Sequence, residues 1–457
     1  MHLNSVLQAI GNTPLVKVNH IDTGPCELFL KLENQNPGGS IKDRIALSMI
    51  NEAEKNGELK PGQEIVEATA GNTGLGLALV AGIKGYKLSL VIPDKMSTEK
   101  VQHLKAMGID IIITRSDVGK GHPEYYQDLA KKIATERNAF FIDQFNNPAN
   151  PKAHFTTTGP EIWEQTDKDV DAIVFGVGSS GTMTGLTQFF KTVKPDLQLI
   201  LADPQGSILA DYVNKGIINE EVGSWFVEGI GEDFIPSISD FSMTSKGYAI
   251  SDRESFETAR LLLLKEGILG GSSSGTLLAA ALHYCREQTS PKRVVTFVCD
   301  SGNKYLTKVY NDLWMKDHGL FNRPQYNDLR DVIFRRFEER EVVSIKPSDT
   351  LMNAFLKMKN NEISQLPVID DKRVVGIVDE SDLLLAVSGE TQNFDCKVYE
   401  VMSKNLVSIR PDQSEQELLN ILKKDFTAIV ETTEGDFCGV ITKIDYLSFL
   451  QLYKQIH

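Results

Sequence analysis

The residues most suggestive of chemistry lie in the stretch NPGGSIKDR (36–44), where one lysine follows a Gly-Gly-Ser turn. Gly38 and Gly39 break the chain, and Ser40 can cap a helix that would begin near Lys42. The helix dipole disfavours an ammonium group there, and a lysine held neutral is a nucleophile that forms imines. The stretch therefore suggests covalent catalysis, although a solvated first-turn lysine stays open on this evidence alone.

Three stretches rich in glycine and hydroxyl residues precede predicted helices. They are ATAGNTGLGLAL (68–79), FGVGSSGTMTG (175–185) and EGILGGSSSGTLLAA (266–280). A helix N-terminus exposes unpaired amides and a partial positive charge, which suits a carboxylate or a phosphate. Taken singly, each could instead be a capped turn, a turn without a ligand, or a place of close helix packing.

The second stretch contains the pattern GxGxxG, which by itself suggests a dinucleotide fold. The pattern lies past the middle of its domain, and Ser179, Ser180 and Thr182 crowd it with hydroxyls. Hydroxyls together with helix amides suit one terminal phosphate better than a buried pyrophosphate. Asp203 follows at a spacing that leaves NAD open.

Pyridoxal phosphate accounts for all of these features at once. The cofactor needs a lysine for a Schiff base, a cup for its phosphate and a group facing its ring nitrogen. Lys42, the cup at 178–182 and a serine from 272–274 supply the three.

Short apolar runs alternate with amphipathic stretches over the first two thirds of the chain. The runs predict strands at 88–93, 109–114, 171–178, 197–204 and 293–300. The amphipathic stretches predict helices at 97–108, 124–137, 181–193 and 252–266. This alternation predicts an α/β fold whose mostly parallel sheet is covered on both faces and binds ligands beyond the carboxyl ends of its strands.

Composition excludes several classes of protein. The formal charge of −14 over 457 residues disfavours nonspecific binding to nucleic acid or anionic lipid. Five scattered cysteines without CxxC spacing indicate neither a disulfide framework nor a zinc site, so we expect no metal. We find no secretory signal and no run of about 18 apolar residues, and we expect a cytoplasmic protein in a reducing compartment.

The pattern changes after Trp314, where a polar segment predicts a linker. We predict a catalytic domain over 1–320, a linker over 321–330 and a C-terminal module over 331–457. The module contains a repeat with copies at about 331–390 and 395–457, and two copies predict a pseudo-symmetric pair rather than a solenoid. The matching segments are 342–358 with 406–422, and 374–387 with 437–450.

The motifs NPGGSIKDR, GNTGLGLAL, GSSGTMTG and GGSSSG resemble the β-family, or fold type II, of pyridoxal-phosphate enzymes, which includes cysteine synthase and cystathionine β-synthase. The stretches ADPQGSILA, VEGIGEDFIP and CDSGNKYLTKVYNDLWM favour the cystathionine β-synthases within that family. The repeat resembles a tandem pair of CBS motifs, known as a Bateman module. The resemblance covers nearly the whole chain, and it is a strong signal because several motifs occur in the family's order.

The resemblance implies a role for each motif residue. Lys42 would form the Schiff base, Asn72 would bind the ring hydroxyl, and Ser273 would face the pyridine nitrogen. The phosphate would be held by Gly178, Ser179, Ser180, Gly181 and Thr182. The substrate carboxylate would be held by Thr69, Ala70, Gly71, Asn72 and Thr73. Gln144 and Gly229 would border the substrate pocket.

The implied reaction is β-replacement, in which L-serine and L-homocysteine give L-cystathionine and water, and cysteine as donor would release hydrogen sulfide. Ala70 replaces a serine usual in relatives, and Glu232 stands where many cystathionine synthases have tyrosine, so either could shift substrate preference. The haem-binding extension of animal relatives is absent. We therefore expect no haem, with His2 and Cys26 as ordinary residues.

The Bateman resemblance implies an adenosyl ligand between the two copies. The ribose-binding pattern is a hydroxyl followed three residues later by aspartate, and Thr442 with Asp445 matches it. In the first copy Asp382 matches, but Asp379 replaces the hydroxyl residue. An acid there would repel nucleotide phosphates, so S-adenosylmethionine fits better, while a purely structural or dimerising module stays open. Family members are usually dimers or larger, so we expect a homo-oligomer.

Other functions also stay open. The nearest rival is a cysteine synthase that uses O-acetylserine and sulfide. A dinucleotide-binding oxidoreductase and a catalytically inactive ligand sensor are more distant alternatives.

Overall fold

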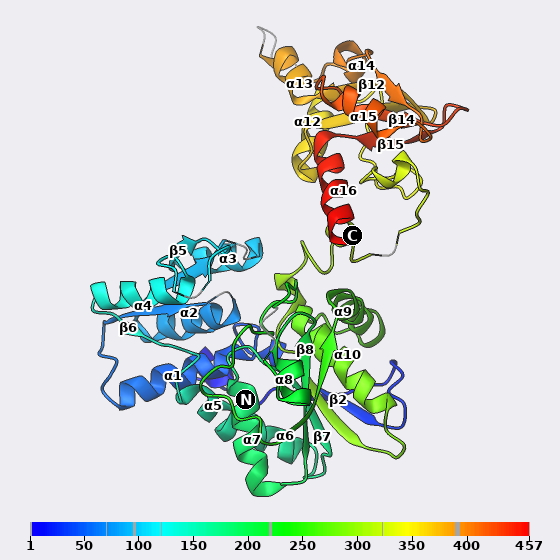
Figure 1. Ribbon diagram of the computed structural model, residues 1–457. Coiled ribbons are helices and arrows are strands. Elements are labelled where there is room, and N and C mark those ends of the chain that lie inside the picture. Colours follow the sequence, from blue (N-terminus) through cyan, green and yellow to red (C-terminus); the bar gives the residue numbers. More distant parts are fainter. Residues whose placement is uncertain are drawn as a thin grey trace. The chain divides into compact units, whose positions relative to one another are not determined.

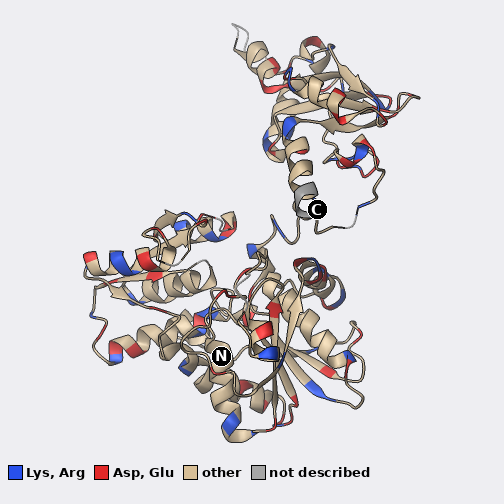
Figure 2. Ribbon diagram, viewed as in Figure 1, with Lys and Arg blue, Asp and Glu red and all other residues tan. Residues whose placement is uncertain are grey.

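The computed structural model describes residues 2–69, 71–94, 97–119, 121–218, 222–321, 323–388 and 394–456 (Figure 1). The chain divides into two compact units, Met1–Tyr310 and Asn311–His457. Within the described ranges, no helix is long and apolar enough to cross a bilayer. Acidic and basic residues are interspersed along the described parts of both units (Figure 2).

The first unit contains a six-stranded sheet in the order β1-β2-β10-β7-β8-β9. β1 pairs with β2 antiparallel, and the other neighbouring pairs are parallel. The strands are β1 (Leu15–Lys17), β2 (Glu27–Lys31), β7 (Ala172–Gly176), β8 (Gln198–Pro204), β9 (Thr244–Ile250) and β10 (Arg293–Phe297). The carboxyl ends of β7 and β10 therefore point to the same edge of this sheet.

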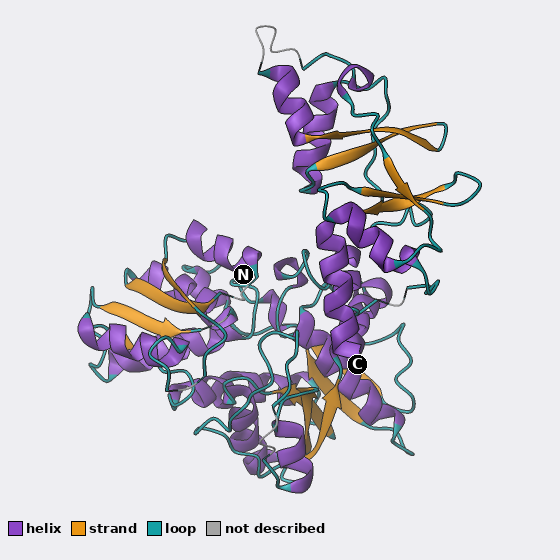
Figure 3. Ribbon diagram, turned by 45° about the horizontal axis from the view of Figure 1, so that its top comes forward, coloured by secondary structure: helices purple, strands orange, loops and turns teal. Residues whose placement is uncertain are grey.

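A second, all-parallel sheet in the same unit has the order β5-β4-β3-β6. Its strands are β3 (Glu64–Ala68), β4 (Lys87–Pro93), β5 (Asp110–Thr114) and β6 (Phe140–Phe141). Alternate residues of β3 face opposite sides: Ile65 packs with α1 and α2, and Val66 packs with α4. Both faces are thus covered by helices, which explains the continuous apolar runs in the sequence (Figure 3).

The helices of the first unit run between these strands. They are α1 (Lys42–Lys55), α2 (Asn72–Lys84), α3 (Thr98–Ala106), α4 (Tyr126–Glu136), α5 (Ala149–Ala153), a π-helical turn (His154–Thr158), α6 (Gly159–Gln165), α7 (Gly181–Val193), α8 (Leu209–Lys215), α9 (Asp252–Glu266) and α10 (Ser272–Arg286). Short 3-10 turns cover Val6–Ala9, Glu33–Gln35 and Gly302–Lys304.

The predicted elements agree with the structure. The helices predicted at 181–193 and 252–266 match α7 and α9 at both ends, and the predicted α/β class is confirmed. The largest difference lies at β10, which ends at Phe297 and not at residue 300. Val298 still pairs with Lys31, but Cys299 and Asp300 turn away from the strand and toward the predicted site.

The second unit contains the two copies of the repeat. The first has α12 (Leu351–Asn361), the antiparallel pair β11 (Gln365–Asp370) and β12 (Arg373–Asp379), and α13 (Glu380–Val387). The second has α14 (Val398–Val401), β13 (Val407–Ile409), α15 (Glu415–Leu422), β14 (Ala428–Glu431), β15 (Phe437–Ile441) and α16 (Lys443–Ile456). The matched segments thus form equivalent elements.

Residues at the start of the second unit are structured. α11 (Asp312–Asp317) and a 3-10 turn (Leu329–Asp331) precede the repeat. Leu329 packs into the core with Leu418 and Ile441, and its N–H donates to the Pro411 carbonyl at 3.0 Å. The segment predicted as a linker therefore contributes to this core.

Candidate active site

Lys42 is the first residue of α1, and the N-cap is Ile41 rather than the predicted Ser40, although the Lys42 N–H donates to the Ser40 hydroxyl at 3.3 Å. Its Nζ lies 3.3 Å from Ser179 Oγ. No carboxylate among the described residues forms an ion pair with it. Burial lowers the pKa of Lys42, and the nearby Cys299 and Glu232 oppose this only in part. The side chain is therefore biased toward the neutral amine that a nucleophile needs.

The predicted phosphate cup is the loop that joins β7 to α7. Ser180 has φ of 68° and is the N-cap of α7, yet its side chain caps no amide. Its hydroxyl instead lies 2.6 Å from that of Ser239. The first turn of α7 therefore presents amides, together with the hydroxyls of Ser179 and Thr182, beside Lys42.

Two residues that sequence reasoning missed support this cup. Asn150 Nδ2 donates to Ser179 Oγ at 3.0 Å and to the Gln144 carbonyl at 2.8 Å. A Cβ on Gly181 would lie only 1.7 Å from Asn150 Oδ1, so glycine is required there. His154 Nε2 lies 3.2 Å from Thr182 Oγ1, and burial lowers the pKa of His154 well below its usual value.

The predicted substrate loop leads from β3 into α2. The N–H of Gly71 donates to Thr69 Oγ1 at 3.2 Å, and Thr73 Oγ1 donates to Gln144 Oε1 at 2.8 Å. The structure thus brings Gln144 to this loop, and its role at the border of the substrate pocket stays a prediction. Ala70 lies outside the described residues. Gly71 is the N-cap of α2 and has no side chain to satisfy the first amides, which leaves them available to an anion.

Asn72, the first residue of α2, is held on both sides of its amide. Its Nδ2 donates to Asp300 Oδ2 at 2.7 Å, and its Oδ1 accepts from Lys304 Nζ at 2.8 Å. Neither partner was identified from the sequence.

Ser273 and Gly229 border the same region. Ser273 is buried at the start of α10 and interacts with the Cys299 thiol. Burial raises the pKa of this thiol to about 12. Gly229 has φ of 90°, and its carbonyl would lie 2.6 Å from a Cβ on Gly178. The two loops therefore need glycine where they touch.

Glu232 is a buried acidic residue that interacts electrostatically with Lys42. Burial raises the pKa of Glu232 well above its usual range, Asp233 raises it further, and Lys42 opposes the shift. Glu232 Oε1 lies 4.0 Å from the position that a Gly178 Cβ would take. The carboxyl group is therefore beside the cup and biased toward its neutral form.

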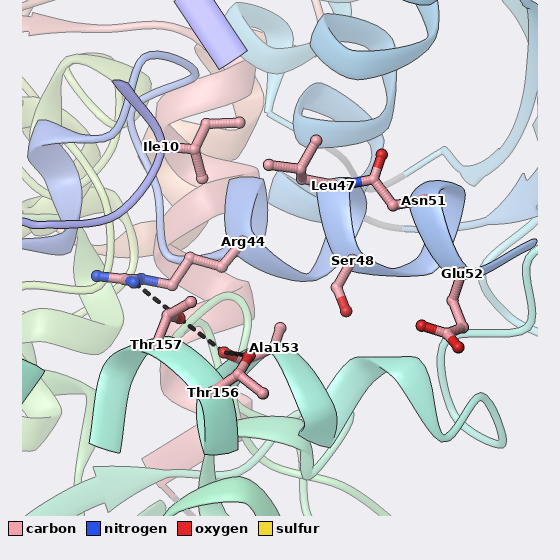
Figure 4. Close-up of a pocket in the computed structure, with 9 residues that line it drawn as sticks. All are labelled: Ile10, Arg44, Leu47, Ser48, Asn51, Glu52, Ala153, Thr156 and Thr157. Carbon is pink, nitrogen blue, oxygen red and sulfur yellow. Dashed lines mark hydrogen bonds between the residues drawn. The ribbon is translucent and has the colours of Figure 1, made fainter. Parts of the chain in front are cut away.

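A cavity of about 270 Å³ lies on another side of α1 (Figure 4). It is lined by Ile10, Leu47 and Thr157 among others, and Arg44 Nη1 donates to Thr157 Oγ1 at 2.9 Å. None of the predicted cofactor residues lines it, so the chemistry of the site belongs to the cup and not to this cavity.

The four residues predicted for an adenosyl ligand lie in the second unit. Asp379 and Asp382 accept each other's backbone N–H at 3.1 and 2.9 Å, which forms a capping box at α13. Thr442 Oγ1 donates to Asp445 Oδ2 at 2.6 Å. The Thr442 N–H donates to Asp445 Oδ2 at 2.7 Å and the Asp445 N–H donates to Thr442 Oγ1 at 3.4 Å, so both copies make reciprocal contacts at the equivalent positions.

Family comparisons agree with this geometry. Residues 6–300 match the family model described as pyridoxal-phosphate dependent enzyme, and residues 331–389 and 398–452 match the CBS domain. The cystathionine beta-synthase of Apis mellifera is 36% identical over 97% of this chain and 90% of its own length. Cysteine synthase A of Salmonella typhi is 41% identical over 67% of this chain and 94% of its own length.

A solved structure shows the same relationship. The O-acetylserine dependent cystathionine beta-synthase of Helicobacter pylori superposes with a TM-score of 0.63 and 36% identity, over 68% of this chain and all of that chain. The fold and site define a fold type II pyridoxal-phosphate enzyme joined to a CBS pair. The chain belongs to the cystathionine β-synthase family, and the predicted resemblance and cofactor are confirmed.

The residues present fit pyridoxal phosphate. The cup offers hydroxyl and amide donors next to a lysine that has no ion-pair partner within the described ranges, which matches one phosphate and one aldehyde. The contact of Gly178 with Gly229 leaves no room for a side chain on the cup.

Proposed function

We propose that this enzyme condenses L-serine with L-homocysteine to give L-cystathionine and water. The proposal is supported by the similarity to cystathionine beta-synthases along nearly the whole chain. The observation that carries it is Lys42, a lysine with a lowered pKa that faces a phosphate-binding loop. Bound pyridoxal phosphate withdraws the electron pair that is left when the substrate loses its Cα proton.

We assign the remaining steps to residues of this chain. Lys42 Nζ would hold the cofactor until the substrate amine takes its place, and the freed Nζ then takes the Cα proton. The Cβ–O bond breaks, and the hydroxyl leaves as water with the proton of the acceptor thiol. The thiol sulfur adds at Cβ, and Lys42 returns the proton to Cα. The amides at the start of α2 hold the substrate carboxylate, with Thr73 and Gln144 shaping the pocket. Asn72 donates to the ring hydroxyl, residues 178–182 hold the phosphate, and Ser273 faces the ring nitrogen.

A second candidate function is supported by the similarity to cysteine synthase A and to an O-acetylserine dependent cystathionine beta-synthase. The candidate is cysteine synthesis from O-acetylserine and sulfide, or cystathionine synthesis from O-acetylserine. Cysteine as donor would release hydrogen sulfide in either case.

A substrate panel separates these activities. Serine with homocysteine should give the highest kcat/KM, and O-acetylserine with sulfide should give a lower value. The reverse order would replace the first proposal by the second. An absorption spectrum taken first should show the visible band of lysine-bound cofactor, and without that band the panel would not be interpretable as β-replacement.

We also propose that S-adenosylmethionine binds the C-terminal pair at Thr442 and Asp445, within a module that spans residues 331–457 of a homo-oligomer. Calorimetry should show a saturable heat, which Thr442→Ala reduces and Asp379→Ala leaves unchanged, because Asp379 lacks the hydroxyl of the ribose-binding pattern. No heat at millimolar ligand would remove this proposal.

The free cysteines support a reducing, cytoplasmic location.

A further inference from the structure

Lys304 is a buried lysine that the proposed mechanism does not use. Only 7% of its surface is exposed. Its Nζ donates to the carbonyls of Gly38 and Gly39 at 3.1 and 3.2 Å and to Asn72 Oδ1 at 2.8 Å. One ammonium group therefore joins the turn that precedes Lys42 to the first residue of α2.

The contacts of Asn72 have only one chemically allowed orientation. An ammonium group can only donate a hydrogen bond, and an ionised carboxylate can only accept one. Lys304 must therefore face the oxygen of the Asn72 amide, and Asp300 must face its nitrogen. Because Nδ2 carries two hydrogens, one N–H remains for a further acceptor. Asn72 can consequently offer this N–H to a ligand as a hydrogen-bond donor.

A second contact holds the turn before Lys42 from the other side. The Gly38 N–H donates to Asp43 Oδ2 at 2.5 Å, while the Gly38 carbonyl accepts from Lys304. Gly39 adopts φ of 74°, and its own carbonyl also accepts from Lys304. The position of the turn, and with it the start of α1, thus depends on the same ammonium group.

We propose that Lys304 is a positioning residue for the cofactor, which fixes the amide of Asn72 as a hydrogen-bond donor to the ring oxygen and holds the turn that carries Lys42. The inference rests on the proposed role of Asn72. Lys304 itself touches neither substrate nor cofactor in this account, and it acts through the two segments that it joins.

The test measures cofactor affinity and the pH titration of the visible band, not only turnover. Lys304→Met should weaken pyridoxal phosphate binding by about tenfold or more, since charge-assisted hydrogen bonds are lost, and should shift the titration of the band. Lys304→Arg should retain most of the affinity. Lys308→Met is the matched control, because Lys308 pairs with Glu228 at 2.7 Å and should leave both readouts unchanged.

A double-mutant cycle with Asn72→Ala separates the possible failures. If Lys304 acts through Asn72, the double variant should lose less affinity than the product of the two single losses. Strictly multiplicative losses, or a Lys304→Met protein with unchanged affinity and band, would overturn the inference. An Asn72→Ala protein with unchanged affinity would instead overturn the proposed role of Asn72. Should Lys304→Met fail to fold, Lys304→Gln carries the same expectation.

Discussion

Three helices at the active site begin differently from three helices of the second unit. At the active site α2, α7 and α10 start at Gly71, Ser180 and Gly271 without a side-chain cap. In the second unit α12, α13 and α15 are each capped by a side chain, from Thr350, Asp379 and Ser414. Capping satisfies amides internally and stabilises a helix, whereas an uncapped start leaves donors for an anion. The first arrangement favours ligand binding and the second favours stability.

The largest effect should come from removing the lysine at the uncapped site. Lys42→Ala should lower β-replacement by ~10³-fold, within the range for loss of a general base, and should abolish the visible band. Steady-state rates and an absorption spectrum measure this. The second unit should keep its thermal transition, so a parallel loss of that transition would show that the variant is globally unfolded.

A second variant tests the ion cluster behind α1. Glu161 accepts from Arg44 and Lys31 at 2.7 Å. Burial opposes its ionisation, but these partners outweigh burial and lower the pKa of Glu161 to about 2. Its contribution to stability is therefore present above the unfolded-state pKa of about 4.3 and is lost as pH falls toward 2.

Glu161→Gln should consequently cost about 3 kcal/mol of unfolding free energy at neutral pH, because it leaves a buried cation poorly paired. The difference from the unchanged protein should shrink below about pH 4. The control is Asp425→Asn, which breaks the exposed pair with Lys443 in the second unit and should change stability by less than about 1 kcal/mol. Equal costs for the two variants would contradict this contrast.

The cup itself can be tested with a single methyl group. Gly181→Ala would place a Cβ against Asn150 Oδ1 and should displace Asn150 from Ser179. We expect cofactor affinity to fall by roughly tenfold, the value of about one hydrogen bond to a charged group. Gly82→Ala is the control within α2, because a Cβ there meets nothing within 4 Å. Cofactor titrations that do not distinguish the two variants would argue against a close-fitting cup.

The smallest expected effects come from two variants that compare a capped helix start in the second unit with an uncapped one at the active site. Asp379→Ala should destabilise the second unit by about 1 kcal/mol, as loss of an N-cap does. Ser180→Ala should cost the cofactor-free protein about 1 kcal/mol at most, because Ser180 caps no amide and loses only its hydrogen bond to Ser239, yet it should weaken cofactor binding. Denaturant unfolding and cofactor titration measure the two. A reversal of these outcomes would mean that capping and ligand binding are not separated between the units.

Short stretches of sequence were sufficient to predict much of the secondary structure and the repeat. Lys42 could be placed at a helix start because glycines and a serine precede it, and α7 could be bounded because a buried strand leads directly into its glycine-rich turn. The repeat in the second unit could be found because its two copies are similar in sequence. The glycine-rich turns also pointed to the cup, although the roles of its residues remain predictions.

The supporting residues could not be found in that way. Lys304 contacts Asn72 across 232 positions of the chain, and Asn150 reaches Ser179 across 29. The order of strands in the sheets and the path of the loops bring these pairs of residues together. Neither the strand order nor the loop path can be predicted from a short stretch of sequence. The same holds for residues 321–330, whose polar composition predicts a linker, although Arg330 pairs with Asp328 and Leu329 is buried.

The most direct test of the account traps the lysine. The holoenzyme is reduced with borohydride and digested, and the modified peptide is identified by mass spectrometry. We predict a single pyridoxyl adduct on Lys42. An adduct on another buried lysine, such as Lys100 or Lys304, or a preparation that takes up no cofactor, would contradict the central claim that Lys42 carries the chemistry.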